Sequence, residues 1–541
     1  MRFDVVIRGG RVLDGTGAPP YRADVAIGGD RIAAVGRLDG AQAGTVIDAT
    51  GRFVAPGFVD CHVHGDSAVF DPVVQQAALR QGVTTFVLGQ DGLSYAPGSA
   101  ATVAYAARYF AAVNGPPPGT PTSAGAGNGP DGGKRPSPGG AGHGPSAGAP
   151  VDGSLTVAEL LGGYDRAVPL NTVYLLPHGT IRYDVMGPSP DPAAGDELAA
   201  MVRRVERGLS EGASGLSSGL EYLPGRYASA EELAALCRPL GGLPYVTHMR
   251  AYGVRAETGM AEVMEIAERS GTAVHVSHLH GPASVLAPLV ARALGEGVDL
   301  TFDTYPYLRG NTILAMVVLP PSVPGAEPDR ALEMIASPEL DEWWPTLDGT
   351  WQRLTVSHAP GLEWAEGLTM VAAAERAGVV PAEFCRRLLT ETRLTAGVVS
   401  ARPDEGPEGE QSVRTMLRHP SHTGGSDGIY VGGHPHPRGF GAFARFLGRH
   451  VRELGDWTWE QAVVHLASHP ARRFGLVDRG LVRGGFAADV VVLDPDVVAD
   501  RATYAEPRTL AVGVEDVIVS GVPVLAGGEL TGATPGRALR S

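Results

Sequence analysis

Two histidines stand one residue apart at the end of a short apolar segment, in the sequence His62-Val63-His64 after residues 58–61. Side chains alternate along a β-strand, so residues at positions i and i+2 point to the same side. Two neutral imidazoles on one side can bind one divalent cation. Alone, the pair is weak evidence, because a His-x-His spacing also arises by chance.

Other residues that can bind a metal occur at the ends of further predicted strands. His248 stands near the end of residues 245–249, His278 near the end of residues 273–279, and Asp427 follows Gly425-Ser426. Each histidine alone could equally be structural, and the aspartate could be an ordinary turn residue. Their recurrence at successive strand ends favours one shared metal site.

The segments that must position these residues alternate between strand-like and helix-like patterns. Strand-like residues 58–62, 84–88, 171–176, 245–249, 273–279 and 300–304 are interleaved with helix-like residues 72–81, 192–211, 258–270 and 284–295. This alternation is typical of βα units around a parallel sheet. Its extent predicts a (β/α)8 TIM-like barrel, in which functional residues gather at the C-terminal ends of the strands.

Both ends of the chain have a different pattern, with short β-type segments separated by Gly- and Asp-containing turns. We therefore expect a small β-sandwich built from both termini, residues 1–54 and 470–541, around a barrel of residues 55–469. Residues 114–153 are rich in Gly, Pro, Ala and Ser and have little to bury. We expect this insertion to be disordered and without a catalytic role.

The composition of the chain excludes several classes of partner. The 541 residues carry a net charge of −15, which argues against binding to nucleic acid or to an anionic membrane surface. The three cysteines are too few for a disulfide framework. No signal peptide or membrane-spanning run is evident. We expect a cytoplasmic protein that acts on a small molecule.

At this point the sequence resembles the D-aminoacylase (N-acyl-D-amino-acid deacylase) branch of the amidohydrolase superfamily. The resemblance covers nearly the whole chain except residues 114–153. It rests on Ala55-Pro56-Gly57-Phe58-Val59-Asp60, Gly82-Val83-Thr84-Thr85, His178-Gly179-Thr180-Ile181-Arg182, Gly215-Leu216-Ser217-Ser218-Gly219-Leu220-Glu221-Tyr222, Phe302-Asp303-Thr304-Tyr305-Pro306-Tyr307, Ser426-Asp427-Gly428, His436-Pro437-Arg438, Pro470-Ala471-Arg472-Arg473-Phe474-Gly475-Leu476 and Ala487-Ala488-Asp489.

The resemblance implies a zinc-dependent hydrolase with one or two metal ions, although another divalent metal could serve. It assigns metal ligands to His62, His64, His248 and His278, and both a metal contact and the general-base role to Asp427. The implied reaction is hydrolysis of the N-acyl bond of an N-acyl-D-amino acid by metal-activated water.

Two positions depart from the pattern of the resembled family. The family has a cysteine ligand in a Gly-Asn-Cys-Gly-like turn, where this chain has Gly89-Gln90-Asp91-Gly92, so Asp91 would replace the thiolate. A carboxylate can hold or bridge divalent metals but is a harder ligand. Asp91 could also belong to an ordinary Asp-Gly turn. The family's His-Leu-Lys is here His278-Leu279-His280, so any contact made by that lysine must change.

An N-acyl amino acid carries a carboxylate, which an arginine fork can bind. Arg250 and Arg309 follow predicted core strands, and Tyr305 or Tyr307 could donate a hydrogen bond. These four residues are therefore candidate substrate contacts, although most arginines of a chain are surface charges.

Two other functions remain as alternatives. The first is another amidohydrolase reaction, on cyclic amides or dipeptides. Against it, hydantoinases, dihydroorotases and ureases bridge two metals with a carboxylated lysine, and the only lysine of this chain is Lys134 in the insertion. The second is a non-catalytic assembly protein with the same fold, which the retained histidines and Asp427 disfavour.

Overall fold

The structure, a computed structural model, describes residues 2–118 and 153–540. At its centre, eight parallel strand positions form a closed barrel. They are β8 (Phe58–Asp60), β10 (Val83–Leu88), β11 (Asn171–Tyr174) continued by β12 (Leu176–Pro177), β13 (Leu216–Gly219), β14 (Tyr245–His248), β15 (Val274–Val276), β16 (Leu300–Thr304) and β20 (His422–Gly424). Neighbouring strands run in the order β11-β10-β8 and β12-β13-β14-β15-β16-β20. The backbone N–H of Cys61 donates to the carbonyl of Gly424 at 3.2 Å and closes the ring.

Helices cover the outside of the barrel. The principal ones are α1 (Pro72–Leu79), α4 (Val157–Tyr164), α5 (His178–Met186), α6 (Gly195–Ser210), α7 (Ala230–Cys237), α8 (Ala256–Ser270), α9 (Ala283–Gly295), α14 (Pro407–Leu417), α15 (Arg438–Arg445), α16 (Trp459–Val463) and α17 (His469–Arg473). In α8 the buried residues Met260, Val263, Ile266 and Ala267 recur every three to four positions, which is the spacing of one helix face. The predicted barrel is confirmed.

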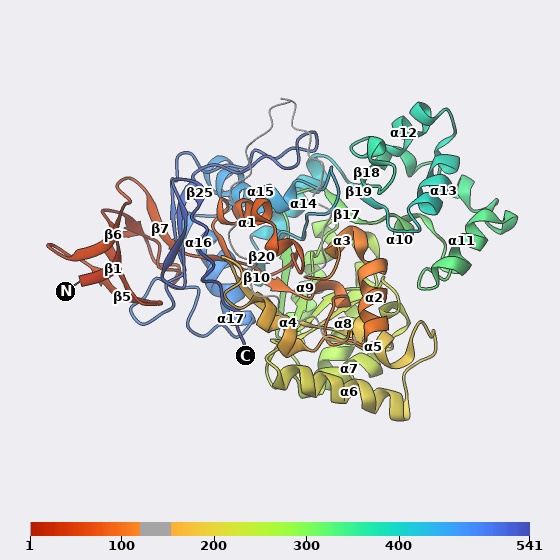
Figure 1. The fold of residues 1–541 in the computed structure, drawn as a ribbon, viewed down its shortest axis with the longest axis horizontal. Helices are drawn as coiled ribbons and strands as arrows, with labels where there is room; N and C mark the ends of the chain where they lie inside the picture. Colours follow the sequence, from red (N-terminus) through yellow and green to blue (C-terminus); the bar gives the residue numbers. More distant parts are fainter. Residues whose placement is uncertain (1, 119–152, 541) are drawn as a thin grey trace.

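Both chain termini contribute to a β-sandwich beside the barrel, where the red and dark blue strands lie together (Figure 1). One sheet has the order β5-β4-β1-β6 and the other the order β25-β24-β23-β22-β7-β2-β3. The strands are β1 (Arg2–Arg8), β2 (Arg11–Val12), β3 (Tyr21–Arg22), β4 (Asp24–Gly28), β5 (Arg31–Gly36), β6 (Gln42–Asp48), β7 (Phe53–Pro56), β22 (Val490–Leu493), β23 (Val514–Val519), β24 (Val522–Ala526) and β25 (Glu529–Leu530). The predicted sandwich is confirmed, and the exact domain limits stay predictions.

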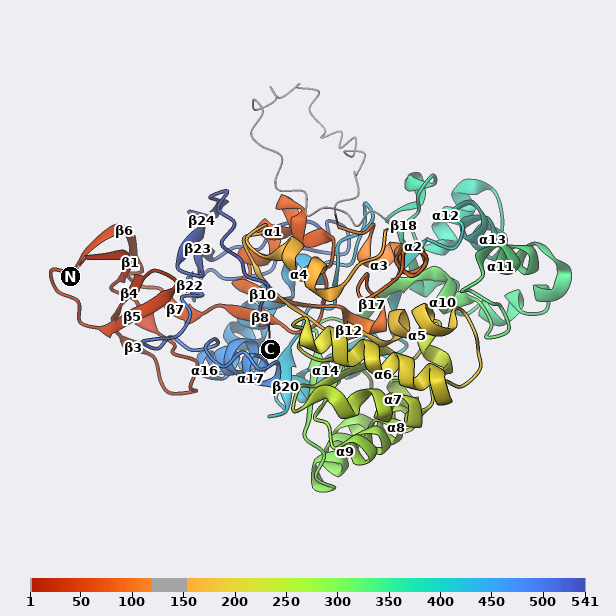
Figure 2. The same cartoon turned by 60° about the horizontal axis from the view of Figure 1, so that its bottom comes forward.

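A lobe of residues 309–401, which the sequence did not predict as a separate unit, is inserted in the chain between β16 and β20, and its helices lie at the opposite end of the molecule from the sandwich (Figures 1 and 2). It contains β17 (Arg309–Ile313), α10 (Leu314–Val318), α11 (Pro328–Ala336), β18 (Leu354–His358), α12 (Met370–Ala377), α13 (Pro381–Glu391) and β19 (Gly397–Ala401). Its three strands form an antiparallel sheet in the order β17-β19-β18. Buried Leu354, Phe384 and Leu388 belong to a hydrophobic cluster distinct from that of the barrel.

Most of the predicted insertion, residues 114–153, and with it Lys134, lies outside the described residues. On its N-terminal side, α2 (Ala100–Tyr109) and α3 (Ala111–Asn114) pack against the barrel. Within residues 2–118 and 153–540, no helix combines the length and the apolar character that a bilayer crossing requires.

Candidate metal centre

His62 and His64 follow the first barrel strand at its C-terminal end, and both side chains are buried. The buried carboxylate of Asp60 holds this segment against the loop after β20. It accepts hydrogen bonds from the backbone of His62 at 3.3 Å and from the backbone and hydroxyl of Ser426 at 2.8 Å and 2.5 Å. Burial raises the pKa of Asp60 to about 7, although the Ser426 bonds oppose the shift. The first and last strands are thereby joined where the site lies.

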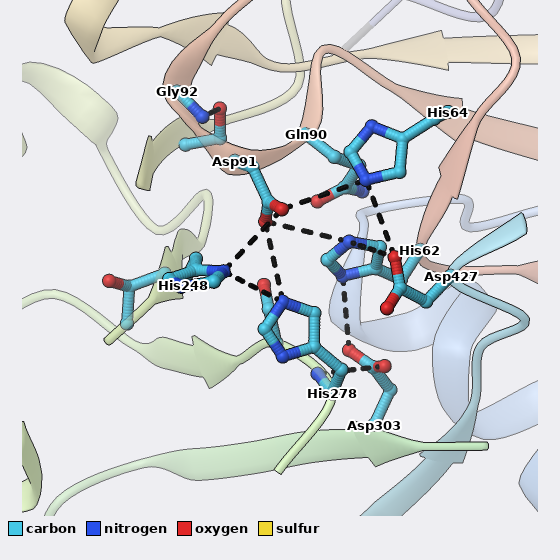
Figure 3. A network of polar contacts seen from close by, with 12 residues as sticks. His62, His64, Gln90, Asp91, Gly92, His248, His278, Asp303 and Asp427 are labelled. Atoms are coloured by element: carbon cyan, nitrogen blue, oxygen red, sulfur yellow. Dashed lines mark hydrogen bonds and ion pairs between the residues drawn. The ribbon is translucent and has the colours of Figure 1, made fainter. Parts of the chain in front are cut away.

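Asp91 lies among the four histidines that the sequence singled out (Figure 3). Its carboxylate oxygens lie 3.5 Å from His62 Nε2, 3.6 Å from His64 Nε2, 3.5 Å from His248 Nδ1 and 3.7 Å from His278 Nε2. Because the side chain is 3 % exposed, Asp91 occupies the interior of the cluster, unlike a solvent-facing turn residue.

The backbone around Asp91 explains how a carboxylate reaches this position. Gly89, Asp91 and Gly92 have φ angles of 77°, 55° and 70°, in the left-handed region that glycine adopts without strain. A Cβ atom on Gly92 would lie 2.7 Å from the backbone nitrogen of Gly219. The Gln90 side chain donates to two buried backbone carbonyls, at 2.9 Å and 3.0 Å. The turn is therefore held in one tight conformation.

His248 and His278 form the other side of the cluster, at the ends of β14 and β15. His248 Nδ1 lies 3.0 Å from His278 Nε2, and His248 Nε2 lies 2.9 Å from the Glu221 carboxylate. The backbone N–H of His278 donates to Asp303 at 2.9 Å. Asp303, which the sequence did not single out as a site residue, also lies 3.5 Å from His62 Nδ1. It therefore positions residues from two different strands.

Asp427 closes the cluster from the loop after β20. Its backbone N–H donates to the carbonyl of His62 at 2.7 Å, and its Oδ1 lies 3.4 Å from His64 Nε2. Its Oδ2 lies 2.8 Å from Nη1 of Arg438, whose side chain is fully buried. Burial raises the pKa of Asp427, but Arg438 and the histidines outweigh it and hold the pKa below its ordinary value. Arg438 was part of the motif His436-Pro437-Arg438, yet the sequence did not reveal its contact with Asp427.

These residues fit a divalent metal. Among the described residues, three groups place their ligand atoms within 4.8 Å of one another. Two contain the predicted ligands, His62 with His64 and Asp91, and Asp91 with His248 and His278, and the third is Cys61 with His275 and Asp303. Both ring nitrogens of His62 and Oδ1 of Asp91 are buried without a hydrogen-bond partner among the described residues, a costly state that a bound cation would relieve. Imidazole and carboxylate are ligands that zinc accepts.

The electrostatics of the cluster also favour a bound cation. Burial lowers the pKa of His64, but the carboxylates of Asp427 and Asp91 outweigh it and raise the pKa to about 9. Burial likewise lowers the pKa of His248, and Asp91 and Glu221 raise it to about 10. Such shifts mean that the carboxylates stabilise positive charge at this point, whether a proton or a metal ion carries it.

The structure brings one of the four candidate substrate contacts to the cavity and places the other three elsewhere. Tyr305 lines the cavity beside the metal centre. Tyr307, Arg250 and Arg309 are not among the residues that line it. Arg250 donates to Glu262 at 2.9 Å and to backbone carbonyls of residues 226 and 228, and Arg309 donates to Glu405 at 2.6 Å. Both guanidinium groups are therefore engaged with other parts of the protein.

The cavity has a volume of about 480 Å³ and connects the metal centre to the lobe of residues 309–401. Its floor includes Asp91 and Asp427, and the lobe contributes Met316 and Val317 to its wall. His280 also lines it, with Nδ1 donating to the carbonyl of His278 at 2.8 Å. Burial and the nearby charge of Arg402 hold the pKa of His280 well below its ordinary value.

Comparison with known proteins gives matches over the whole chain. Residues 45–525 match the model of the amidohydrolase family. The N-acyl-D-glutamate deacylase of Alcaligenes xylosoxydans xylosoxydans is 34% identical over 100% of this chain and 97% of its own length. The N-acyl-D-glutamate deacylase of Bordetella bronchiseptica, solved with zinc and a phosphonate mimic of the tetrahedral intermediate, is 31% identical, with a TM-score of 0.78 over 100% of both chains.

A solved D-aminoacylase is also similar over its whole length, with 30% identity and a TM-score of 0.77 over 100% of both chains. That structure concerns a binuclear metal centre in which one metal activates and the second attenuates. The match of fold, length and sequence extends through both the barrel and the sandwich. This chain therefore belongs to the amidohydrolase family, in its D-aminoacylase branch.

Proposed function

We propose that this protein is a zinc-dependent hydrolase that cleaves the N-acyl bond of N-acyl-D-amino acids to a carboxylate and a D-amino acid. The observation that carries the proposal is the convergence of four histidines, Asp91 and Asp427 at one end of a cavity, which all of them except His62 line. The D-configuration rests on the relatives, which deacylate N-acyl-D-glutamate or are D-aminoacylases. The substrate is a small molecule, and we expect no nucleic-acid or membrane partner and a cytoplasmic location.

His62, His64 and Asp91 would hold one metal ion, and His248, His278 and Asp91 a second. The shared residue is Asp91, whose two carboxylate oxygens face both histidine pairs, so it could serve as a bridge in place of the family's cysteine. When bound, zinc lowers the pKa of a coordinated water towards 7 and polarises a carbonyl.

Asp427 is the residue that we assign to proton transfer. Its pKa is held below the ordinary value, so it is a carboxylate at neutral pH and can accept a proton from the attacking water. The same group can then return that proton to the amine nitrogen as the C–N bond breaks. Oδ2 of Asp427 is ion-paired with Nη1 of Arg438, so we assign Oδ1, which lies beside His64, to the proton transfer.

The test is the Asp427→Asn variant, assayed on N-acetyl-D-amino acids together with metal analysis. The variant should keep most of its bound zinc, because the four histidines and Asp91 remain. It should lose most turnover, since general acid–base catalysis contributes roughly 10²- to 10⁴-fold. Near-normal turnover in this variant would exclude Asp427 from proton transfer.

A substrate panel separates this function from its alternatives. N-acetyl-D-amino acids should be hydrolysed in preference to their L-forms, dipeptides and hydantoins. Preferential turnover of hydantoins would favour a cyclic-amide hydrolase instead, and purified protein without stoichiometric metal or turnover would favour an assembly role.

A further inference from the structure

Arg402, directly after β19, carries a buried guanidinium group whose partners are incomplete. The side chain is 8 % exposed, and its Nε and Nη2 atoms are buried without a hydrogen-bond partner. Among the described residues it makes no ion pair, and its one aromatic contact is the ring of Tyr305 at 5.7 Å. A desolvated cation in this state is costly, and an anion bound in the cavity would offset this cost.

Arg402 lines the same cavity as Asp91 and Asp427. A ligand in that cavity can therefore contact the metal centre and Arg402 together. The ring of Tyr305 connects the two regions, because Arg438, the partner of Asp427, lies 4.5 Å from the same ring. The cavity is large enough for a small acylated amino acid, since binding pockets for small molecules begin at about 300 Å³.

The other arginines at the cavity differ from Arg402 in exposure. Arg353 is half-buried and Arg255 is exposed, so neither is a desolvated cation. His280 holds the position of the family's lysine, but its Nδ1 is engaged with a backbone carbonyl. Arg402 is thus the buried cation of the cavity in the part of the chain that the structure describes.

Part of the remaining cavity wall is apolar. Val254, Met316 and Val317 line it together with Tyr222 and Tyr252. Polar residues also line the cavity, among them Glu221, Asn311 and Asp404, and its two further arginines, Arg255 and Arg353, are more exposed than Arg402. The apolar part of the wall is suited to an aliphatic side chain, which gains free energy from burial.

We propose that Arg402 binds the carboxylate of the substrate and that the apolar wall selects N-acyl amino acids with aliphatic side chains. This inference rests on the proposed function and specifies its substrate class. The planar guanidinium group can pair with a carboxylate through two parallel hydrogen bonds, while the acyl bond faces Asp427 and the metal centre.

The test compares Arg402→Gln with the wild-type protein on N-acetyl-D-leucine and on its methyl ester, by release of the free amine. With N-acetyl-D-leucine, KM should rise roughly 10- to 100-fold, the effect of one charge-assisted hydrogen-bonded pair. The kcat should change little, because the contact is the same in the ground and transition states. With the ester, the two proteins should have equal KM. Arg402→Lys should lie between them, since it keeps the charge but not the fork.

Two results separate a binding role from a structural one, and a third tests the selection of aliphatic side chains. The unfolding midpoint of Arg402→Gln should not fall, because the variant removes an unpaired buried charge; a marked fall with equal losses on acid and ester would overturn the proposal. Arg353→Gln is the matched comparison, and a full loss there with none in Arg402→Gln would also overturn it. A wild-type preference for N-acetyl-D-glutamate over N-acetyl-D-leucine would refute the aliphatic selection.

If the metal-loaded wild-type protein hydrolyses no N-acyl amino acid, the proposed function fails independently of Arg402. Calorimetric binding of N-acetyl-D-leucine to the wild-type protein and to Arg402→Gln then decides the assignment. Binding that is equally strong, or absent, in both proteins refutes the role of Arg402.

Discussion

Replacement of Asp91 tests the metal centre most directly. Its carboxylate oxygens lie 3.5 to 3.7 Å from ring nitrogens of four histidines, and it belongs to both groups of predicted ligands. The Asp91→Ala variant therefore leaves each group with two histidines. Loss of a residue that only supports a ligand already costs about 10- to 100-fold in metal affinity, so loss of Asp91 should cost more than this at both sites.

The matched control is Asp303→Asn, because Asp303 supports His62 and His278 without belonging to either of these ligand groups. The assay is zinc content by mass spectrometry after dialysis against graded concentrations of a chelator. Asp303→Asn should show the smaller loss, whereas Asp91→Ala should release zinc at much lower chelator concentrations. Asp91→Cys should retain metal and shift preference towards softer ions.

The reasoning about Asp91 would be refuted by a specific result. If Asp91→Ala kept the zinc stoichiometry of the wild-type protein and its resistance to chelator, the carboxylate would be no ligand. Asp91 would then be a buried residue of the Gly89–Gly92 turn, paired electrostatically with the histidines.

Three further predictions concern stability. Glu232 accepts a hydrogen bond from Arg182 at 2.5 Å, and both side chains are fully buried, so Glu232→Ala should lower the free energy of unfolding by about 3 to 5 kcal/mol. The control variant at the exposed neighbour, Glu231→Ala, should change it by less than about 0.5 kcal/mol. Equal denaturant midpoints for the two variants would contradict this prediction. Burial raises the pKa of Glu232, but its histidine and arginine partners outweigh it and lower the pKa. The stability from ionised Glu232 is therefore present above its unfolded pKa of about 4.3 and is lost as pH falls through its folded pKa. The difference in free energy of unfolding between the wild-type protein and Glu232→Gln should therefore shrink as pH falls from 7 into the acid range. A constant difference would exclude this linkage. Gly92→Ala should reduce both stability and zinc content, because φ is 70° and the new Cβ would lie 2.7 Å from a backbone nitrogen. The control is Gly271→Ala, where φ is also 70° but a new Cβ would meet nothing within 4 Å. This variant should lose only the cost of the backbone conformation, about 1 to 2 kcal/mol, and should retain zinc.

Much of the architecture could be predicted from the sequence because it depends on local periodicity. The helix predicted at residues 284–295 begins and ends within one residue of α9, since an apolar face recurs with the helical period. The spacing of His62 and His64 placed both side chains at the end of the first strand, because strand geometry alternates sides. The (β/α)8 barrel followed from such local patterns in succession.

The lobe of residues 309–401 could not be identified in this way. Its sheet pairs β17 with β19 antiparallel, bringing Arg309 opposite Ala401 across a long stretch of chain. Short-range periodicity contains no information on such pairing. As a result, the contribution of Met316 and Val317 to the cavity became visible only in the folded structure.

The sequence by itself determined the types of residue that we propose carry the chemistry and the strand ends on which they lie, because both depend on local spacing and on the resemblance to a family. The tertiary structure decided which charged side chains lie next to one another. The fold places carboxylates beside the predicted substrate contacts Arg250 and Arg309, and it buries Arg402 with two of its nitrogen atoms lacking a hydrogen-bond partner. Partners of a charge come from distant parts of the chain, and burial determines its energetic cost, so neither can be inferred from local sequence.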